Sequence, residues 1–286
     1  MKPAATNAEI RSQLRWVKVS DGTDLSRFPD FFIVGPQRTG TSWLYAHLRF
    51  HPDILLSRPK EIFFFSSLRS RDPRRFVTDH LEWYLRFFRD PVWLWAIKMS
   101  VCMYRYHRLY RPRILGESTA SYASLAPDVI DDIVRLNPAI KVILMVRNPV
   151  ERAWSDAKYY FERRQRRIAD VPAVELKAFF TDEYQLRCSR YSENYDNWSS
   201  RVLPGHLFLG RFEDIAVRPE RLMLDMMRFI GARDDPSYVS ASINEAVNTT
   251  STSRISAYYR QFLEELFEDE LNGLRDRFGF AWAGPG

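Results

Sequence analysis

The stretch FFIVGPQRTGTSWLY, residues 31–45, decides the fold because it joins a short apolar run to a glycine loop and the start of a helix. The run Phe31–Val34 has the length and composition of a buried parallel strand. Gly35, four further residues and then Gly40-Thr41-Ser42 form the skeleton of an ATP-binding phosphate loop. In place of that loop's lysine the chain has Thr41, and a positive charge lies upstream at Arg38.

A strand, a glycine loop and a helix in this order build a site for an anion. Backbone N–H groups and the positive end of the helix point at the ligand, and Thr41 and Ser42 add hydroxyl donors. The alternative is a tight strand-to-helix turn that binds nothing. We predict a phosphate-bearing ligand at this loop.

The rest of the chain alternates short apolar runs with helical patterns. Further strands are expected at Ile54–Leu56, Lys141–Arg147 and His206–Phe212, and helices at Ser42–Phe50, Pro127–Leu136, Pro149–Gln165, Pro219–Ile230 and Ser256–Phe278. Residues 61–111 are aromatic and basic, and are expected to form helices and loops over the sheet. The alternation predicts an α/β fold, a parallel β-sheet flanked by helices. Without a linker or repeat, residues 30–286 are expected to form one domain after an N-terminal lead-in, residues 1–29.

The composition narrows the classes of partner. A net charge of +6 favours an anionic ligand, and nucleic acid or a membrane surface would also satisfy it. No zinc spacing, RNP-type signature or basic heptad region points to nucleic acid. Cys102 and Cys188 lie far apart, which predicts neither a disulfide nor a metal site and favours a reducing compartment, the cytoplasm. The N-terminal residues have no apolar stretch suited to a signal peptide or membrane anchor. The basic run of residues 163–167 is a solvated helix face or a docking patch for an acidic acceptor.

The second long apolar run argues against ATP hydrolysis. A kinase or ATPase needs a metal-binding Asp at the end of a second strand. The run KVILMVRNP, residues 141–149, ends in Arg147-Asn148 instead. Such a chain suits a nucleotide that needs positive charge at two separate places and no metal.

The two motifs together resemble those of the sulfotransferases that use 3′-phosphoadenosine 5′-phosphosulfate (PAPS). GPQRTGTSWLY is similar to their 5′-phosphosulfate loop, and their second motif is an Arg at a strand end followed eight residues later by a Ser, as in Arg147 and Ser155. An Arg fork can hold a terminal phosphate through two bonds, and a hydroxyl completes the grip. The resemblance implies a P-loop NTPase-like sulfotransferase fold and PAPS as the donor. It implies donor contacts from Gln37, Arg38, Thr39, Gly40, Thr41 and Ser42, with Arg147 and Ser155 on the 3′-phosphate.

Later segments resemble the heparan-sulfate or carbohydrate branch of that family, in a bacterial-type soluble member. KEIFF, residues 60–64, is similar to a segment whose Glu is the catalytic base, which implies this role for Glu61. GESTASY, residues 116–122, and FEDI, residues 212–215, also resemble family segments. Ser118 stands where the family has a lysine, for which Lys60 or Lys98 are candidates to compensate. The family's basic loop corresponds to residues 246–256, where only Arg254 is kept to contact the donor.

The sequence therefore predicts the transfer of a sulfuryl group from PAPS to a hydroxyl or amine of a saccharide, glycolipid or hydroxylated natural product. Glu61 and Arg38 are the expected catalytic residues, and no metal is expected. The alternatives are a P-loop small-molecule kinase or NTPase and a nucleotide-binding module without catalysis. Glu61 argues against the binding module, because a protein that only binds a nucleotide has no need for a carboxylate beside its phosphate loop. The other interpretation is that Lys60 and Glu61 form only a surface ion pair. Trp83, Tyr84, Trp93 and Trp95 either line the acceptor site or belong to the core.

Overall fold

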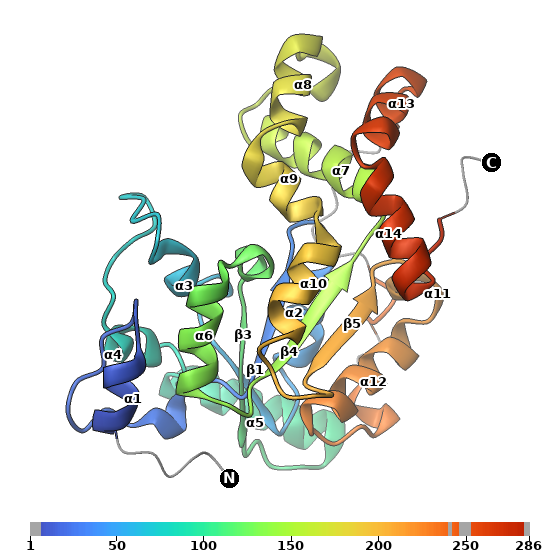
Figure 1. Cartoon of the computed structure of the whole chain (residues 1–286). Coiled ribbons are helices and arrows are strands. Elements are labelled where there is room, and N and C mark those ends of the chain that lie inside the picture. Colours follow the sequence, from blue (N-terminus) through green and yellow to red (C-terminus); the bar gives the residue numbers. More distant parts are fainter. Residues whose placement is uncertain (1–6, 240–241, 246–252, 283–286) are drawn as a thin grey trace.

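A parallel five-stranded sheet forms the centre of the structure, a computed structural model that describes residues 7–239, 242–245 and 253–282 (Figure 1). The strands are β1 (Phe31–Gly35), β2 (Ile54–Leu56), β3 (Ile114–Ser118), β4 (Lys141–Val146) and β5 (Leu207–Arg211). They pair in the order β2-β3-β1-β4-β5, and every pairing is parallel. The predicted fold class, a parallel sheet flanked by helices, is confirmed.

Helices pack on both faces of the sheet and extend beyond one end of it (Figure 1). The α-helices are α1 (Asn7–Gln13), α2 (Thr41–Leu48), α3 (Phe64–Ser67), α4 (Leu81–Leu85), α5 (Val92–Tyr106), α6 (Pro127–Leu136), α7 (Pro149–Glu162), α8 (Ala173–Phe180), α9 (Glu183–Ser189), α10 (Tyr191–Ser199), α11 (Asp214–Val217), α12 (Pro219–Ile230), α13 (Ala257–Leu266) and α14 (Glu268–Phe278). Short 3-10 helices are η1 (Leu25–Arg27), η2 (Ala120–Ser124), η3 (Ile168–Asp170) and η4 (Pro236–Tyr238). Within the described ranges, none of these helices has the length and apolar character needed to cross a bilayer.

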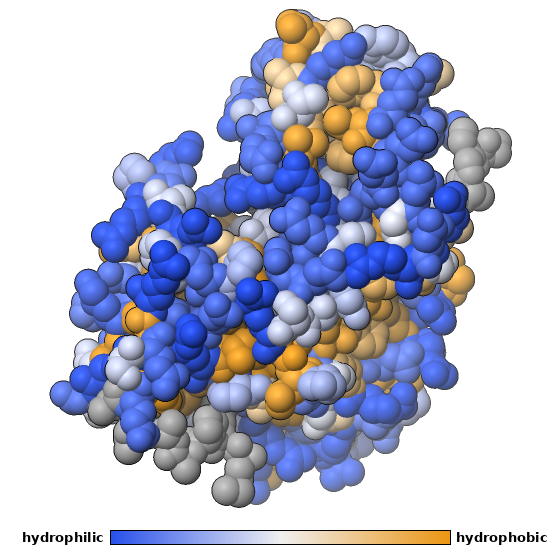
Figure 2. Space-filling model, in the orientation of Figure 1, coloured by the Kyte–Doolittle hydropathy of each residue, from blue (hydrophilic) through white to orange (hydrophobic). Residues whose placement is uncertain are grey.

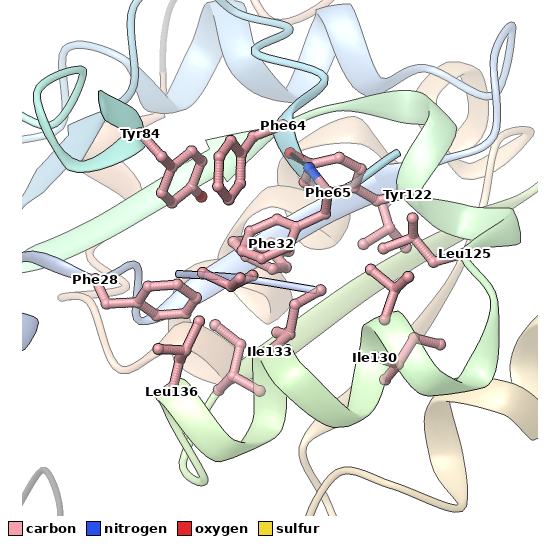
Figure 3. Packing of buried hydrophobic residues seen from close by; sticks show 14 of the residues in the cluster. Phe28, Phe32, Phe64, Phe65, Tyr84, Tyr122, Leu125, Ile130, Ile133 and Leu136 are labelled. Carbon is pink, nitrogen blue, oxygen red and sulfur yellow. Dashed lines mark hydrogen bonds between the residues drawn. The ribbon is translucent and has the colours of Figure 1, made fainter. Parts of the chain in front are cut away.

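The side chains of β1 alternate between two hydrophobic cores, as a strand covered on both faces requires. Phe32 points into the core that α6 covers, where it packs with Phe65, Tyr122 and Ile133 (Figure 3). Phe31 and Ile33 face the opposite core, which is closed by α2 and α12. The sheet is therefore held rigidly from both sides, and its strand ends are fixed in space.

A third apolar cluster lies beyond the sheet, between α7, α8 and α13. Phe161, Phe180 and Leu263 meet there, and all three are buried. Figure 2 shows apolar surface between α8 and α13, and further apolar surface lower on the same face. This cluster anchors α7, the helix that follows β4.

Most of the predicted elements are confirmed within a few residues. The strands at β1, β2, β4 and β5 and the helices α2, α6, α7 and α12 are present, and α6 and α12 have the predicted bounds. Strand β3 was not predicted, because only Ile114 and Leu115 precede Gly116, Glu117 and Ser118. The expected helix over residues 256–278 is two helices that meet at Phe267.

The segment expected to be a loose lead-in packs against the core instead. Ile10, Val17 and Phe28 are buried in the core that contains α6. The Asp132 carboxylate of α6 accepts hydrogen bonds from the backbone N–H groups of residues 15–17, at 2.7 to 3.2 Å. This capture is a long-range contact that the local sequence of residues 1–29 does not reveal. The division of the chain into lead-in and domain stays a prediction.

Candidate functional site

The loops that follow β1, β3 and β4 meet at the carboxyl edge of the sheet. In open α/β sheets, ligands bind at this edge, between two adjacent strands whose following connections run in opposite directions along the sheet. Here β1 lies between β3 and β4, and the three strands run parallel. The loop of residues 36–40, the segment after Ser118 and the start of α7 therefore face the same space.

The loop between β1 and α2 curls tightly around an N-terminal helix end. Arg38 and Gly40 have positive φ angles of 67° and 92°, and the Thr39 hydroxyl donates to the Pro36 carbonyl oxygen at 2.6 Å. A Cβ on Gly40 would lie 2.4 Å from Ile215 Cδ1, so glycine is required at this close approach. The N-cap residue of α2 is Gly40, which has no side chain to cap the helix, and the backbone N–H groups of a helix N-terminus can bind an anion.

The structure brings the two predicted donor motifs into direct contact. Arg38 Nε donates to Ser155 Oγ at 3.0 Å, and Arg147 Nη1 donates to the Arg38 carbonyl oxygen at 3.0 Å. The Arg147 guanidinium also stacks on the Phe212 ring, 4.3 Å from its centroid. The side chain of Arg38 thus reaches towards α7, where its guanidinium lies 5.0 Å from the Tyr159 ring centroid.

Positive charge is concentrated at this contact. Burial lowers the pKa of Arg38 below its ordinary value, and the carboxylate of Asp156 opposes that shift. Burial also lowers the pKa of Arg147, with a further lowering by the charge of Arg38. Burial also lowers the pKa of Lys158 on α7, and the positive charges of Arg147 and Arg38 lower it further. A bound anion would relieve this mutual repulsion.

A cavity of about 360 Å³ opens beside Arg147 and contains a residue that the sequence did not single out. Its lining includes Phe212, Glu151 and Arg260, and Arg260 Nη2 donates to Glu151 Oε1 at 2.8 Å. Arg260 comes from α13, more than a hundred residues after Arg147, and no motif marks it. Only the tertiary packing of α13 against α7 reveals it.

Lys60 and Glu61 lie on the other side of the phosphate loop. Lys60 Nζ is 2.9 Å from Glu61 Oε1 and 3.4 Å from Thr41 Oγ1, at the first residue of α2. The side chains of Lys60 and Glu61 are 22% and 28% exposed, so both can meet a ligand. The structure therefore places a carboxylate and an ammonium group beside the helix end that can hold an anion.

The other candidate to replace the family lysine lies elsewhere. Lys98 is buried in α5, where its ammonium pairs with the Asp90 carboxylate at 2.9 Å and donates to Tyr110 at 3.1 Å. Ser118 itself is fully buried, and its hydroxyl has no hydrogen-bond partner among the described residues. Of these two candidates, Lys60 is therefore the one that the structure brings to the site.

A buried carboxylate behind Glu61 was visible in the sequence only as part of a family segment. Glu117, at the end of β3, accepts hydrogen bonds from the Tyr84 hydroxyl and, at 2.6 Å, from Thr119. The Thr119 oxygen in turn accepts from the backbone N–H of Ile62 at 3.1 Å. Burial raises the pKa of Glu117 to about 7, and the charge of Glu61 adds to the shift. The backbone next to Glu61 is thus tied to a titratable buried group.

Two of the predicted donor residues have other contacts. Gln37 Nε2 donates to the Tyr184 hydroxyl, and Cys188 Sγ donates to Gln37 Oε1 at 3.3 Å, so this side chain fastens the loop to α9. Arg254 is exposed, next to Ser253, whose carbonyl oxygen accepts from Trp154 of α7 at 3.2 Å. Residues 246–252 of the expected basic loop lie outside the described residues.

The aromatic residues considered for the acceptor site divide between core and surface. Tyr84 is buried and stacks on Phe64, with ring centroids 5.0 Å apart (Figure 3). Trp83 is half-buried against Phe64 and Phe87. Trp93 and Trp95 are exposed on α5. Tyr84 therefore supports the site from behind through Glu117, and does not line it.

Comparison with known sequences places the chain. The profile of the sulfotransferase domain family matches residues 28–277. The membrane-associated sulfotransferase kil1 of Dictyostelium discoideum is 28% identical over 147 residues, which cover 51% of this chain and 26% of the relative. The human bifunctional heparan sulfate N-deacetylase/N-sulfotransferase 3 is 24% identical over 236 residues, 75% of this chain and 24% of the relative. The chain thus spans about a quarter of the length of these curated relatives.

Comparison with solved structures gives the same fold. A sulfotransferase from Alicyclobacillus acidocaldarius superposes with a TM-score of 0.63 at 23% identity, over 89% of this chain and 97% of that one. The likeness at this identity concerns the fold, a parallel sheet with a phosphate loop after its first strand. Together with the family profile, which spans most of the sequence, it leads to one conclusion: the chain belongs to the sulfotransferase family.

Proposed function

We propose that the protein transfers a sulfuryl group from PAPS to a hydroxyl or amine of an acceptor. The observation that carries the proposal is the direct contact between the phosphate loop and the strand-end motif, through Arg38, Arg147 and Ser155. Family membership supports the reaction type. A strand-to-helix turn without a ligand needs no cluster of partly buried cations at this place.

The site fits a nucleotide with anionic groups at both ends. At one end, the N-terminus of α2 presents its backbone N–H groups and its positive dipole end, with Lys60 beside Thr41. At the other, Arg147 lines a cavity together with Arg260, and Ser155 lies within hydrogen-bond distance of Arg38, whose carbonyl oxygen Arg147 contacts. PAPS has a phosphosulfate at its 5′ position and a phosphate at its 3′ position, whereas ATP has no 3′-phosphate. The second cluster of cations therefore favours PAPS over ATP.

We assign the proton transfer to Glu61. PAPS supplies an activated sulfuryl group, with adenosine 3′,5′-bisphosphate as the leaving group. A hydroxyl attacks poorly while it keeps its proton, so a base within hydrogen-bond reach has to accept that proton as the new bond forms. Glu61 is partly exposed beside the start of α2, and Lys60 holds one of its oxygens. The Lys60 ammonium and Arg38 are the cations that can stabilise the negative charge of the leaving oxygen.

The acceptor is proposed to be a saccharide, with a glycolipid or a hydroxylated natural product as alternatives. The relatives named heparan sulfate N-deacetylase/N-sulfotransferases support a saccharide amine or hydroxyl. A cytoplasmic location and independence of metal ions stay predictions.

The donor is tested by thermal unfolding with matched nucleotides in the presence of EDTA. Adenosine 3′,5′-bisphosphate should raise the melting temperature, and adenosine 5′-monophosphate, which lacks only the 3′-phosphate, should do so much less. A ligand at 100 times its dissociation constant contributes about 2.7 kcal/mol. In a parallel measurement without EDTA, equal stabilisation by ATP with magnesium would favour the kinase alternative. Mass spectrometry of candidate acceptors incubated with PAPS and the protein then tests the transfer, as an added sulfonate.

A further inference from the structure

Helix α5 presents an unusually apolar surface to solvent. Six of its 15 residues are exposed large apolar side chains, here called the α5 face: Val92, Trp93, Trp95, Ile97, Met103 and Tyr104. Val92 is 84% exposed and Tyr104 is 85% exposed. In the rest of the described chain, side chains of this kind are scattered over several elements. Exposed apolar side chains gathered on one element indicate an interaction site.

Helix α5 packs against the rest of the protein through a narrow row of buried residues. Its buried residues are Leu94, Lys98 and Cys102, four residues apart and therefore on one side of the helix. Lys98 is neutralised by Asp90 in that row, so the only charged residue on the remainder of the helix is Arg105, in its last turn. The outward surface is thus uncharged over most of a helix about 22 Å long.

Positive charge surrounds this apolar surface. Six arginines in residues 86–113 are exposed: Arg86, Arg89, Arg105, Arg108, Arg111 and Arg113. The one acidic residue in this range, Asp90, has a side chain only 3% exposed. The region therefore carries a large excess of one charge at its surface.

A basic cavity of about 500 Å³ lies after the end of α5. Its lining includes Arg108, Arg111 and Arg233, and Arg233 holds Asp53 at 2.7 Å. Among the described residues, neither Arg108 nor Arg111 forms an ion pair. Two exposed guanidinium groups next to an apolar helix can therefore bind the phosphates of an external partner.

We propose that the α5 face and the arginines around it dock onto an anionic lipid surface. A helix with aromatic and aliphatic side chains on its outer side, flanked by arginines, lies in a membrane interface with its apolar side chains among the acyl chains. Trp and Tyr favour that interface, and each arginine near an anionic leaflet strengthens the binding. The partner has to be negatively charged because the surface of residues 86–113 exposes no acid.

A second copy of the chain fits this surface less well. A symmetric contact between two α5 faces would bring like charges together, because residues 86–113 expose six arginines and their one acidic residue, Asp90, is buried in its pair with Lys98. The docking surface also adjoins the proposed site. Arg58 precedes Lys60 by two residues, and its guanidinium lies 5.4 Å from the centroid of the Trp93 ring. The inference goes beyond the proposed function, because lipid docking requires neither donor nor acceptor.

The test is co-sedimentation of the whole protein with lipid vesicles. We expect binding to vesicles of phosphatidylcholine and phosphatidylglycerol at a ratio of about 7 to 3, weak binding to phosphatidylcholine alone, and a decrease with added salt. One variant removes apolar side chains (Val92→Ser, Trp93→Ser, Tyr104→Ser), and a second reverses charge (Arg108→Glu, Arg111→Glu). Each should weaken vesicle binding about tenfold or more.

Matched controls carry equivalent changes on other exposed positions. Val174→Ser with Leu203→Ser and Val217→Ser, and Arg221→Glu with Arg275→Glu, should bind vesicles like the unaltered protein. Melting temperatures check that all variants are folded. Absence of vesicle binding overturns the proposal, as does an equal loss in the controls. Sedimentation velocity that shows a dimer abolished by the apolar variant, without vesicle binding, would assign the α5 face to self-association instead.

Discussion

The two sides of the candidate site differ in their charged groups: one gathers cations, and the other has two carboxylates beside Lys60. The donor side, formed by the loop of residues 36–40 and the start of α7, gathers Arg38, Arg147 and Lys158. The acceptor side, formed by residues 60–62 and the end of β3, holds two carboxylates, Glu61 and Glu117. Both sides lie at the same edge of one sheet. Binding of an anion would stabilise the clustered cations of the donor side, and binding of a proton would stabilise the buried carboxylate of the acceptor side.

The shifts in pKa express this difference. Burial lowers the pKa of Arg38 and of Arg147, so charge on the donor side is already costly before a ligand binds. Burial raises the pKa of Glu117, and the neighbouring Glu61 raises it further. An anionic ligand would offset the cost of the buried arginine charges, and a bound proton would remove the buried negative charge of Glu117. We expect substitutions on the donor side to divide between binding and rate, and Glu61 to affect rate alone.

The largest effect is expected on the acceptor side, from Glu61→Gln. The amide cannot accept a proton from the acceptor, so the turnover at saturating donor and acceptor should fall about 10²–10⁴-fold. Donor binding should be kept, measured as the melting shift by adenosine 3′,5′-bisphosphate. Glu220→Gln, at an exposed position on α12, is the matched control and should be fully active. Near-normal turnover of the Glu61 variant would remove it from the mechanism and direct attention to Glu117.

A smaller effect on the rate is expected from Arg38→Ala. Removal of a cation that stabilises the leaving oxygen should lower the saturated rate about 10²–10³-fold. In the structure the guanidinium of Arg38 contacts Ser155, so it has to exchange that partner to reach the 5′ end of the donor. If the variant only raises the KM for donor, Arg38 serves the 3′-phosphate. Lys60, close to Thr41, would then be the cation at the leaving oxygen.

Arg147→Ala should act on binding and spare the rate. Its contact with a remote phosphate is similar in the ground and transition states, so the KM for donor rises while the saturated rate is kept. Loss of a charge-assisted contact corresponds to a rise of about 10- to 100-fold. Binding of adenosine 5′-monophosphate, without the 3′-phosphate, should be nearly unchanged. A parallel loss for both nucleotides would mean that the variant disturbs the loop, because Arg147 also donates to the Arg38 carbonyl oxygen.

The sequence was more informative about the donor side than about the acceptor side, for physical reasons. The donor motifs follow β1 and β4, whose apolar runs are continuous because both faces of each strand are covered. Strand β3 was missed because the buried residues at its end are polar, with Glu117 satisfied by Tyr84 and Thr119. Such partners come from distant segments, and local periodicity does not encode them.

Two further differences have the same origin. A single helix was expected over residues 256–278, but α13 packs into the cluster with Phe180, whereas Leu274 of α14 packs against Tyr191 and Val146. Because the helix breaks at Phe267, residues 257–278 can pack into two different hydrophobic clusters. The choice of Lys60 over Lys98 also required the fold, since only tertiary structure shows Lys98 paired with Asp90.

The last prediction concerns the buried Glu117, whose substitution should have the smallest effect on turnover and a measurable effect on stability. Its pKa is about 7 in the folded protein against an ordinary value of 4.5, so the folded state binds the proton more tightly than the unfolded chain. Stability from this group is therefore greatest at low pH and is lost as the pH rises from 4.5 through about 7. The shift corresponds to about 3 kcal/mol of unfolding free energy.

Glu117→Gln removes the titration and keeps a side chain of similar shape for Tyr84 and Thr119 to contact. Urea unfolding at several values between about pH 5 and pH 8 should show the unaltered protein losing about 2–3 kcal/mol relative to the variant. Parallel stability profiles for the two proteins would show that Glu117 is already ionised at low pH. Because Thr119 still holds the Ile62 N–H, turnover should change only a few-fold. A loss as large as that of Glu61→Gln would instead place Glu117 in the chemistry, and the two carboxylates would have to be treated as one titrating pair.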